Sequence, residues 1–228
     1  MKDTYVYEGS NVLINKLNIK DSKKLDELEG AIVSLNIARL STHPLKIKSV
    51  LDIKTIHKEL FSDLYEWAGE NRTINIYKDE PVLGGLSVNY SDYRHIDNDL
   101  KTLDNSFQII KWNELSHKEI IDEIVLLISK LWRIHCFREG NTRTTTVFLN
   151  LLMKQIGLKV NTDFIGKHAK FFRNALVLAS IDQYSEYEHL TNILLDSVST
   201  KSVKEDKYQT IREYEVEKYE YRKHKYKD

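Results

Sequence analysis

Residues 135–143, HCFREGNTR, lie between two segments whose apolar residues recur at helical spacing. The preceding segment opens at Ser116–Glu119 with the spacing of a capping box and carries a wide apolar face over residues 120–131. The following segment continues with the same periodicity from Thr142 to Gly157. The sequence therefore predicts two core helices joined by a short polar loop.

This loop combines side chains that suit a phosphate-bearing substrate. Gly140 lets the backbone turn so that N–H groups converge, and the N-terminus of the next helix adds its dipole. Arg143 can bind phosphate oxygens, and Glu139 offers the hard oxygen ligand that Mg2+ takes beside substrate phosphates. His135 can accept a proton from a hydroxyl near neutral pH. Each residue alone is more often structural, so the hypothesis depends on their combination.

Composition favours long helices over the rest of the chain. Two prolines and eight glycines among 228 residues disfavour an all-β fold with many turns, and a hydrophobic fraction of 41% is sufficient for a core. The predicted fold class is therefore all-α. Periodicity predicts further helices over residues 21–40, 51–67, 169–180 and 186–199. The apolar stripe expected on the first of these helices comprises Leu25, Leu28, Ile32 and Leu35.

One segment departs from helical spacing. Residues 73–77, TINIY, alternate between polar and β-branched side chains, and KDEPVLGG follows with a proline and a glycine pair. This pattern predicts a short β-hairpin, or flap, over about residues 73–88.

Charge and cysteine content limit the classes of protein that fit. The 34 Lys and Arg balance the 34 Asp and Glu, so no net basic charge favours direct binding of nucleic acid. With Cys136 as the single cysteine, no intramolecular disulfide is possible and a reducing compartment fits best. The N-terminus lacks a signal-peptide pattern, and no apolar run is long enough to cross a bilayer. We expect a cytoplasmic protein with no membrane association.

The composition changes at the C-terminal end. Residues 201–228 hold five of the 13 tyrosines among dense mixed charges. We expect a solvated helix or frayed tail here, with a helix that docks a partner as the alternative. The predicted organisation is a main domain over residues 1–200, with its core at about 50–197 and a helical N-terminal part at 1–49, followed by the 201–228 tail.

The loop sequence resembles the signature of the Fic family, HPFx(D/E)GNxR, at every functional position except the proline. YEWAGENRTINI, at residues 65–76, resembles the family segment that leads into its flap, and GSNVLINKLNI, at 9–19, resembles a common Fic N-terminus. The resemblance covers roughly residues 5–197. It implies a Fic-type helical bundle with a short β-hairpin flap.

Fic proteins transfer AMP from ATP to a hydroxyl of a target protein, with Mg2+. The resemblance therefore implies that His135 is the general base for a Tyr, Ser or Thr hydroxyl and that Glu139 holds Mg2+. The residues expected to bind the ATP phosphates are Gly140, Asn141, Thr142 and Arg143. The flap residues expected to dock the target are Thr73, Ile74, Asn75 and Ile76.

Two departures from the family pattern bear on nucleotide binding and regulation. Cys136 replaces the proline, and Thr146 stands where the family usually has a second arginine that binds the γ-phosphate. In autoinhibited members that arginine also pairs with a glutamate of an (S/T)xxxE(G/N) helix. Glu29-Gly30 has the ending of this motif, but Leu25 occupies its Ser/Thr position. We therefore hypothesise that any inhibition comes from a separate small antitoxin.

Two alternatives remain open at this point. The absence of the second arginine at Thr146 is compatible with phosphoryl transfer or another nucleotide-derived donor, although the phosphorylating relatives carry lysine at the position of Thr142. A catalytically weak binding module is the other alternative, and the intact functional residues of the loop argue against it. The resemblance to antitoxin-paired Fic toxins suggests DNA gyrase or topoisomerase IV as targets.

Overall fold

The structure is a computed structural model that describes residues 3–199, 205–208 and 211, and this part of the chain is helical without a β-strand. The predicted all-α class is confirmed. The α-helices are α1 (Ser22–Thr42), α2 (Asp52–Phe61), α3 (Ile96–Gln108), α4 (His117–Ile134), α5 (Asn141–Gln155), α6 (Thr162–Lys167), α7 (Ala169–Leu178) and α8 (Glu188–Ser197). Short 3-10 turns occupy η1 (Pro81–Leu83), η2 (Trp112–Glu114), η3 (Asp182–Tyr184) and η4 (Glu205–Tyr208).

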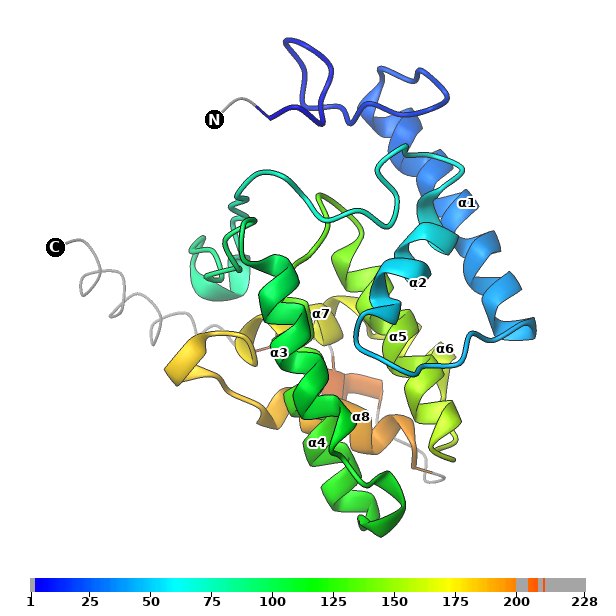
Figure 1. The fold of residues 1–228 in the computed structure, drawn as a ribbon, viewed down its shortest axis with the longest axis vertical. Coiled ribbons are helices and arrows are strands. Elements are labelled where there is room, and N and C mark those ends of the chain that lie inside the picture. Colours follow the sequence, from blue (N-terminus) through cyan, green and yellow to red (C-terminus); the bar gives the residue numbers. More distant parts are fainter. Residues whose placement is uncertain (1–2, 200–204, 209–210, 212–228) are drawn as a thin grey trace, which may run out of the picture.

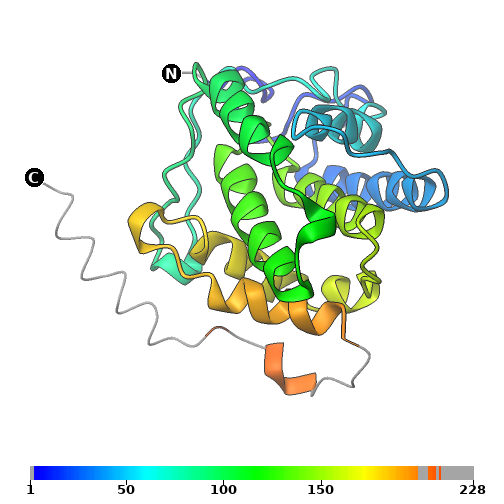
Figure 2. The ribbon, with the colours of Figure 1, turned by 60° about the horizontal axis from the view of Figure 1, so that its bottom comes forward.

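Helix α4 lies at the centre of the molecule. It contacts α3, α5, α7 and α8, while α2 bridges α1 and α5. In Figure 1, α1 runs along the right edge, and in Figure 2 the orange α8 lies across α4. One hydrophobic cluster lies between α4, α7 and α8, and a second lies between α1, α2, α3 and α5. The loop after α4 is thus held between two packed halves.

Local sequence signals place the two ends of α4. The Ser116 hydroxyl accepts a hydrogen bond from the Glu119 N–H, and the Glu119 carboxylate accepts one from the Ser116 N–H at 2.8 Å, which confirms the capping box. The helix ends at Ile134, and the next residue, His135, is left-handed with φ of +51°. The chain therefore turns sharply at the first residue of the polar loop.

The second helix is shorter than its apolar pattern predicts. It ends at Phe61 instead of continuing to residue 67, because the Leu60 carbonyl accepts the Asn36 side chain at 3.1 Å. The Leu64 N–H turns to the Phe61 carbonyl, and the Leu64 carbonyl accepts the Lys16 N–H at 2.8 Å. Contacts from other segments thus replace the last helical turn.

The apolar stripe predicted for α1 is wrong in part. Leu35 is 71% exposed, whereas Glu29 and Asn36 lie buried on the face that packs against α2. Both polar side chains find hydrogen-bond partners there, which offsets the cost of removing them from water. The residues that α1 buries are Leu25, Glu29, Val33, Asn36 and Leu40.

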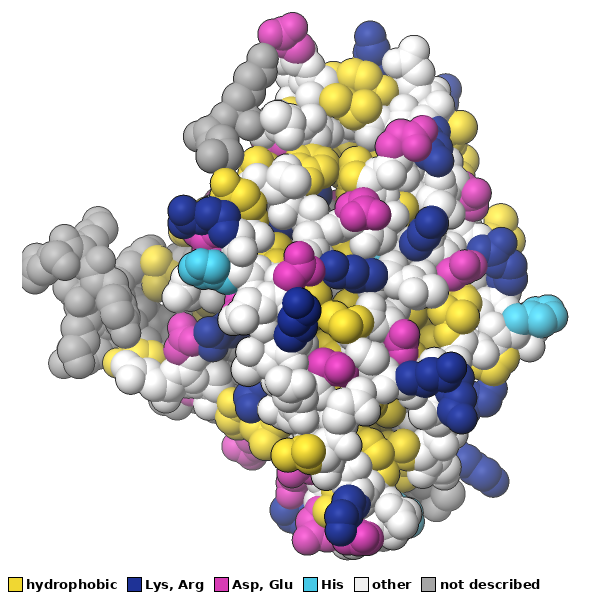
Figure 3. Space-filling view, viewed as in Figure 1, with side chains coloured by type: hydrophobic (Ala, Val, Ile, Leu, Met, Phe, Trp, Pro, Cys, Tyr) yellow, Lys and Arg dark blue, Asp and Glu magenta, His cyan; other side chains and the backbone are white. Residues whose placement is uncertain are grey.

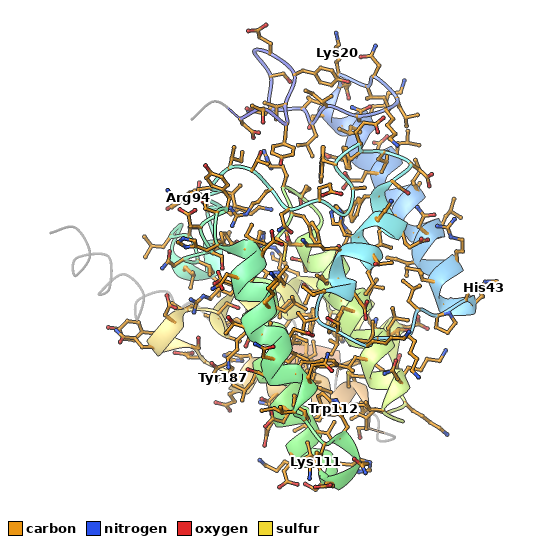
Figure 4. The ribbon with its side chains drawn as sticks, viewed as in Figure 1. Lys20, His43, Arg94, Lys111, Trp112 and Tyr187 are labelled. Carbon is orange, nitrogen blue, oxygen red and sulfur yellow. The ribbon has the colours of Figure 1, made fainter. Side chains whose placement is uncertain are left out.

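The sequence analysis did not predict helices α3 and α6. Helix α3 buries Ile96, Leu100, Leu103 and Phe107, which recur at helical spacing. Figure 4 shows Lys111 and Trp112 in the connection from α3 to α4. The half-buried Trp112 packs against both hydrophobic clusters. In the same view Lys20 and His43 mark the two ends of α1.

The predicted β-hairpin is absent, and the segment over residues 73–88, called the flap segment below, contains no strand. Its one bridge joins Glu80 and Leu86 around η1. Side chains occupy the backbone groups that a ladder would use: the Arg72 guanidinium donates to the Ile74 carbonyl at 2.7 Å, and the Lys78 N–H donates to the Ser87 hydroxyl at 3.2 Å. Side chains thus bind backbone groups that a second strand would otherwise pair with.

Charges of both signs intersperse on the face shown in Figure 3. Among the described residues no helix combines the length and apolarity needed to cross a membrane. The predicted 201–228 tail lies largely outside the described residues, and its predicted boundary at residue 200 does too. Within η4, Tyr208 is buried and its ring contacts Phe164 and Phe171.

Candidate active site

His135 has one nitrogen that is hydrogen-bonded and one that is not. Its Nδ1 lies 3.1 Å from the Trp132 carbonyl, which can only accept, so the proton sits on Nδ1. Its Nε2 is buried and has no hydrogen-bond partner among the described residues. Burial, followed by the charge of Lys78, lowers the pKa of His135 well below its ordinary value. The imidazole is therefore neutral, with an Nε2 lone pair ready to accept a proton.

Asn141 closes the loop instead of facing a ligand. Its carboxamide accepts the Phe137 N–H at 3.0 Å and donates to the Phe137 carbonyl at 2.7 Å, and the residue is 5% exposed. Phe137 in turn stacks on the His57 ring, with centroids 3.8 Å apart. The side chain of Asn141 fixes the loop, and its backbone N–H is the group left for an anion.

The N-terminus of α5 supplies further N–H groups. The first helical hydrogen bond runs from Thr144 N–H to the Gly140 carbonyl at 3.0 Å, so the N–H groups of residues 141–143 have no acceptor within the helix. Gly140 sits in the left-handed region with φ of +80°. The Thr142 hydroxyl accepts the indole N–H of Trp132 at 3.0 Å and ties this turn to α4. These groups and the helix dipole make an anion site.

Glu139 faces a cation already present in the chain. One carboxylate oxygen accepts the Gly140 N–H at 2.9 Å, and the other lies 3.2 Å from the Lys78 ammonium of the flap segment. Burial acts to raise the pKa of Glu139, but Lys78 and the Gly140 N–H outweigh it and the net pKa is lowered. Glu139 is therefore an ionised carboxylate.

The donor set around Glu139 fits Mg2+ shared with a substrate. In the described part of the chain no three His, Cys, Asp or Glu side chains gather into a metal cage. Mg2+ commonly takes one or two carboxylates and completes its shell with water and phosphate oxygens. Glu139 would be the protein ligand of such an ion, and Lys78 shows that a positive charge is favourable at this carboxylate.

Arg143 reaches back to the first helix. Its guanidinium pairs with one oxygen of Glu29, and the Tyr65 hydroxyl donates to the other. The guanidinium also lies over the Phe61 ring at 4.9 Å. Glu29 does not complete the inhibitory motif because of Leu25, yet it contacts the predicted phosphate ligand. The apolar stripe predicted for this helix did not include Glu29, so the sequence analysis missed this contact.

Comparison with known proteins identifies the domain to which this loop belongs. The model of the Fic/DOC family matches residues 48–153. The chain contains a Fic domain. The N-terminal Fic domain of the Bep8 effector from Bartonella sp. 1-1C superposes with a TM-score of 0.72 at 26% identity, over 86% of this chain and 94% of that one.

Two named relatives extend the match beyond the Fic domain model. Protein adenylyltransferase VbhT of Bartonella schoenbuchensis is 30% identical over 199 residues, which is 83% of this chain and 39% of that protein. The Escherichia coli K12 protein named "Probable protein adenylyltransferase Fic" is 22% identical over 168 residues, 74% of this chain and 80% of that one. The chain thus spans well under half of the length of VbhT.

The Fic flap segment lies beside the loop, along a groove of 380 Å³. Ile74 is buried, Ile76 is half-buried, and Thr73 and Asn75 are exposed, so alternate side chains face inward. The backbone N–H of Thr73 donates to the Tyr5 hydroxyl at 3.0 Å. The groove lining comprises Asp3, Ile74, Asn75, Ile76, Tyr77, Lys78, Tyr93 and Arg138.

Arg72 ties the Fic loop to the flap segment, a role that the sequence analysis missed. The guanidinium is 2% exposed and donates to the carbonyls of His135 at 2.8 Å and Ile74 at 2.7 Å, and also to that of Ser91. Its backbone N–H donates to the Cys136 carbonyl at 2.7 Å. No sequence signal distinguishes a buried arginine that binds carbonyls from one on the surface.

The Cys136 thiol takes no part in this chemistry. It is 2% exposed, and burial raises its pKa to about 12. A protonated, buried thiol is not a nucleophile. Cys136 therefore fills the position of the family proline as a small core residue.

Proposed function

We propose that this chain is a protein adenylyltransferase that transfers AMP from ATP to a hydroxyl of a target protein. The single observation that carries the proposal is the buried, unpartnered Nε2 of His135 in a loop that also presents the N-terminus of α5. The names of the curated relatives point to the same activity. The intact loop favours catalysis over a binding module.

In the proposed reaction, the target hydroxyl oxygen attacks the α-phosphorus, and the bond from that phosphorus to the pyrophosphate breaks. His135 Nε2 takes the hydroxyl proton, and its Nδ1–H···O bond to Trp132 keeps the ring oriented. The N–H groups at the start of α5 and the Arg143 guanidinium bind the phosphates as charge moves to the leaving group. Mg2+ held at Glu139 would neutralise phosphate charge.

The flap segment would align the target. Its extended backbone over residues 74–77 borders the groove and has no strand beside it in the described residues. An extended target segment can pair with such an edge through main-chain hydrogen bonds. The target hydroxyl would then lie beside His135.

Two finer proposals concern regulation and targets. We propose that the protein is the toxin of a toxin–antitoxin pair whose targets are DNA gyrase or topoisomerase IV; the loop's resemblance to such toxins and Thr146 in place of the second arginine support this. Expression of the natural operon should yield a complex with a small partner protein. Purification as a monomer without one would count against it.

The test of the activity itself is label transfer. Purified protein, Mg2+ and α-labelled ATP are incubated with a bacterial lysate beside the His135→Ala variant. A discrete labelled protein that disappears with the variant supports adenylyl transfer by this loop. Equal labelling by both proteins would refute the role of His135.

A further inference from the structure

We propose that the buried ion pair between Glu80 and Arg173, together with the Tyr90 hydroxyl, anchors the flap segment for target binding. The three are positioning residues in the proposed reaction, so this inference rests on the proposed function. The anchor joins the tip of the flap segment to α7, which lies 93 residues away in the chain. Figure 2 shows the turn at η1 reaching the helices at the α7 end of the molecule, and η1 and α7 are in contact.

The ion pair has two directed bonds. Arg173 Nη1 donates to Glu80 Oε2 at 2.6 Å, and Nη2 donates to Oε1 at 2.9 Å. The Glu80 side chain is 0% exposed, while that of Arg173 is 35% exposed. A fork of this kind fixes orientation as well as distance, since both bonds must be satisfied together. The partly exposed Arg173 therefore holds the buried Glu80 carboxylate in one orientation.

Tyr90 carries the anchor to the catalytic loop. Its hydroxyl donates to Glu80 Oε1 at 3.1 Å, and burial raises its pKa so that the hydroxyl keeps its proton. Its ring lies against the His135 ring, with centroids 4.0 Å apart, and meets Trp132 edge-on at 5.8 Å. One carboxylate thus links α7, the turn of the flap segment and the face of the imidazole.

In a β-hairpin, the hydrogen bonds between two strands would fix the position of this turn. Here the anchor fixes it. The Glu80 N–H donates to the Leu86 carbonyl at 3.2 Å, and the Glu80 carbonyl accepts the Gly85 N–H at 3.0 Å. The other backbone bonds of this turn lie within residues 80–86, so they close the turn without tying it to α7, and the Glu80 side chain makes that connection. Val82, Leu83 and Val88 are buried in the cluster of α4 and α7. Those apolar contacts would keep the flap segment packed on the protein without the ion pair, but they do not fix the orientation of its backbone toward the groove.

The first test is Glu80→Gln, which keeps the size of the side chain but removes its charge and one of its two acceptor oxygens. A second variant, Glu80→Met with Arg173→Leu, replaces the pair by apolar side chains, a change that buried ion pairs often tolerate without loss of folding. Arg173→Lys keeps the charge but not the two-bond geometry, so its effects should be smaller than those of the other two variants. Glu59→Gln, which breaks the exposed pair with Arg39, is the matched control.

Three measurements are made on each full-length variant: hydrogen exchange of residues 73–90, affinity for the ATP analogue AMPPNP with Mg2+, and label transfer from α-labelled ATP across lysate dilutions. Loss of a charge-assisted bond should speed exchange in the flap segment about tenfold in both test variants. The lysate concentration for half-maximal transfer should rise about tenfold. The AMPPNP affinity should not change.

The outcomes separate the anchor from the activity. Exchange and half-maximal lysate concentration equal to those of Glu59→Gln would overturn the proposal, as would a parallel loss of AMPPNP affinity. If the wild-type protein transfers no label, the proposed function fails. In that case unchanged exchange still refutes the anchor, and increased exchange still supports it.

Discussion

Gly140 offers a quantitative test of how the catalytic loop is packed. Its φ of +80° is strained for any residue with a side chain, and a Cβ there would overlap Phe61 Cζ and lie 2.6 Å from Cε2. The left-handed backbone costs about 1–2 kcal/mol, and overpacking a core typically costs about 1–3 kcal/mol. Gly140→Ala should therefore lower the free energy of unfolding by about 2–5 kcal/mol.

Gly157→Ala separates these two contributions. Gly157 has φ of +87°, and no atom lies within 4 Å of the position that a Cβ would take, so the variant carries the backbone cost alone, about 1–2 kcal/mol. Urea denaturation followed by circular dichroism gives both values. The difference between the variants, about 1–3 kcal/mol, measures the contact with Phe61.

The outcome also depends on the ring itself. Phe61 is 0% exposed and stacks on His57, with centroids 4.6 Å apart, so it cannot move aside freely. Phe61→Leu should cost less in the Gly140→Ala background than in the wild type, because the clash is removed. Equal losses for Gly140→Ala and Gly157→Ala, or strict additivity with Phe61→Leu, would refute the packing argument.

Three further variants test the charges around the loop. Glu29→Gln frees Arg143 for phosphate and should tighten AMPPNP binding about fivefold, as measured by calorimetry. Lys78→Met removes the cation that competes at Glu139, so the half-saturating Mg2+ concentration for AMPPNP binding should fall about two- to fivefold. Burial lowers the pKa of His57 to about 4. The unfolded chain binds its proton from pH 6.5 downward, so stability should fall by about 3 kcal/mol from pH 6.5 to 4 and do so less in His57→Gln, as measured by urea denaturation.

Each of these has a control or a contrary outcome. The exposed Glu27→Gln makes the same charge change on α1 and should leave AMPPNP affinity unchanged. Weaker binding in Glu29→Gln would mean that Glu29 orients Arg143 for the phosphates. An unchanged or higher Mg2+ requirement in Lys78→Met contradicts competition at Glu139. A pH slope in His57→Gln equal to that of the wild type would exclude a depressed pKa at His57.

The sequence was most informative where the determinants of structure are local. The capping box at Ser116 and the left-handed turn at Gly140 are written in neighbouring residues, so the helices on either side of the loop were predictable. The loop motif predicted His135, Glu139 and Arg143 as one site; in the structure Glu139 and Arg143 flank the first residues of α5, and His135 caps the end of α4.

Long-range polar contacts were not predictable in the same way. Glu29 and Asn36 looked like solvent-facing residues, because the groups that satisfy them lie 24 to 114 residues away in the chain. The flap segment has the alternating pattern of a strand, but the buried Arg72 guanidinium donates a hydrogen bond to the Ile74 carbonyl. In the flap segment, the alternation of the sequence predicts which side chains face inward, but it does not predict which side chains donate hydrogen bonds to the backbone carbonyls.

The most direct test of the account compares two labels in one reaction. The protein, Mg2+ and lysate are incubated in parallel with α-labelled and with γ-labelled ATP, beside His135→Ala. Adenylyl transfer by His135 predicts a discrete product with the α-label alone, lost in the variant, because the bond that breaks lies between the α-phosphorus and the pyrophosphate. Transfer of the γ-label would contradict adenylyl transfer and assign the site to phosphorylation, and no transfer of either label would contradict both.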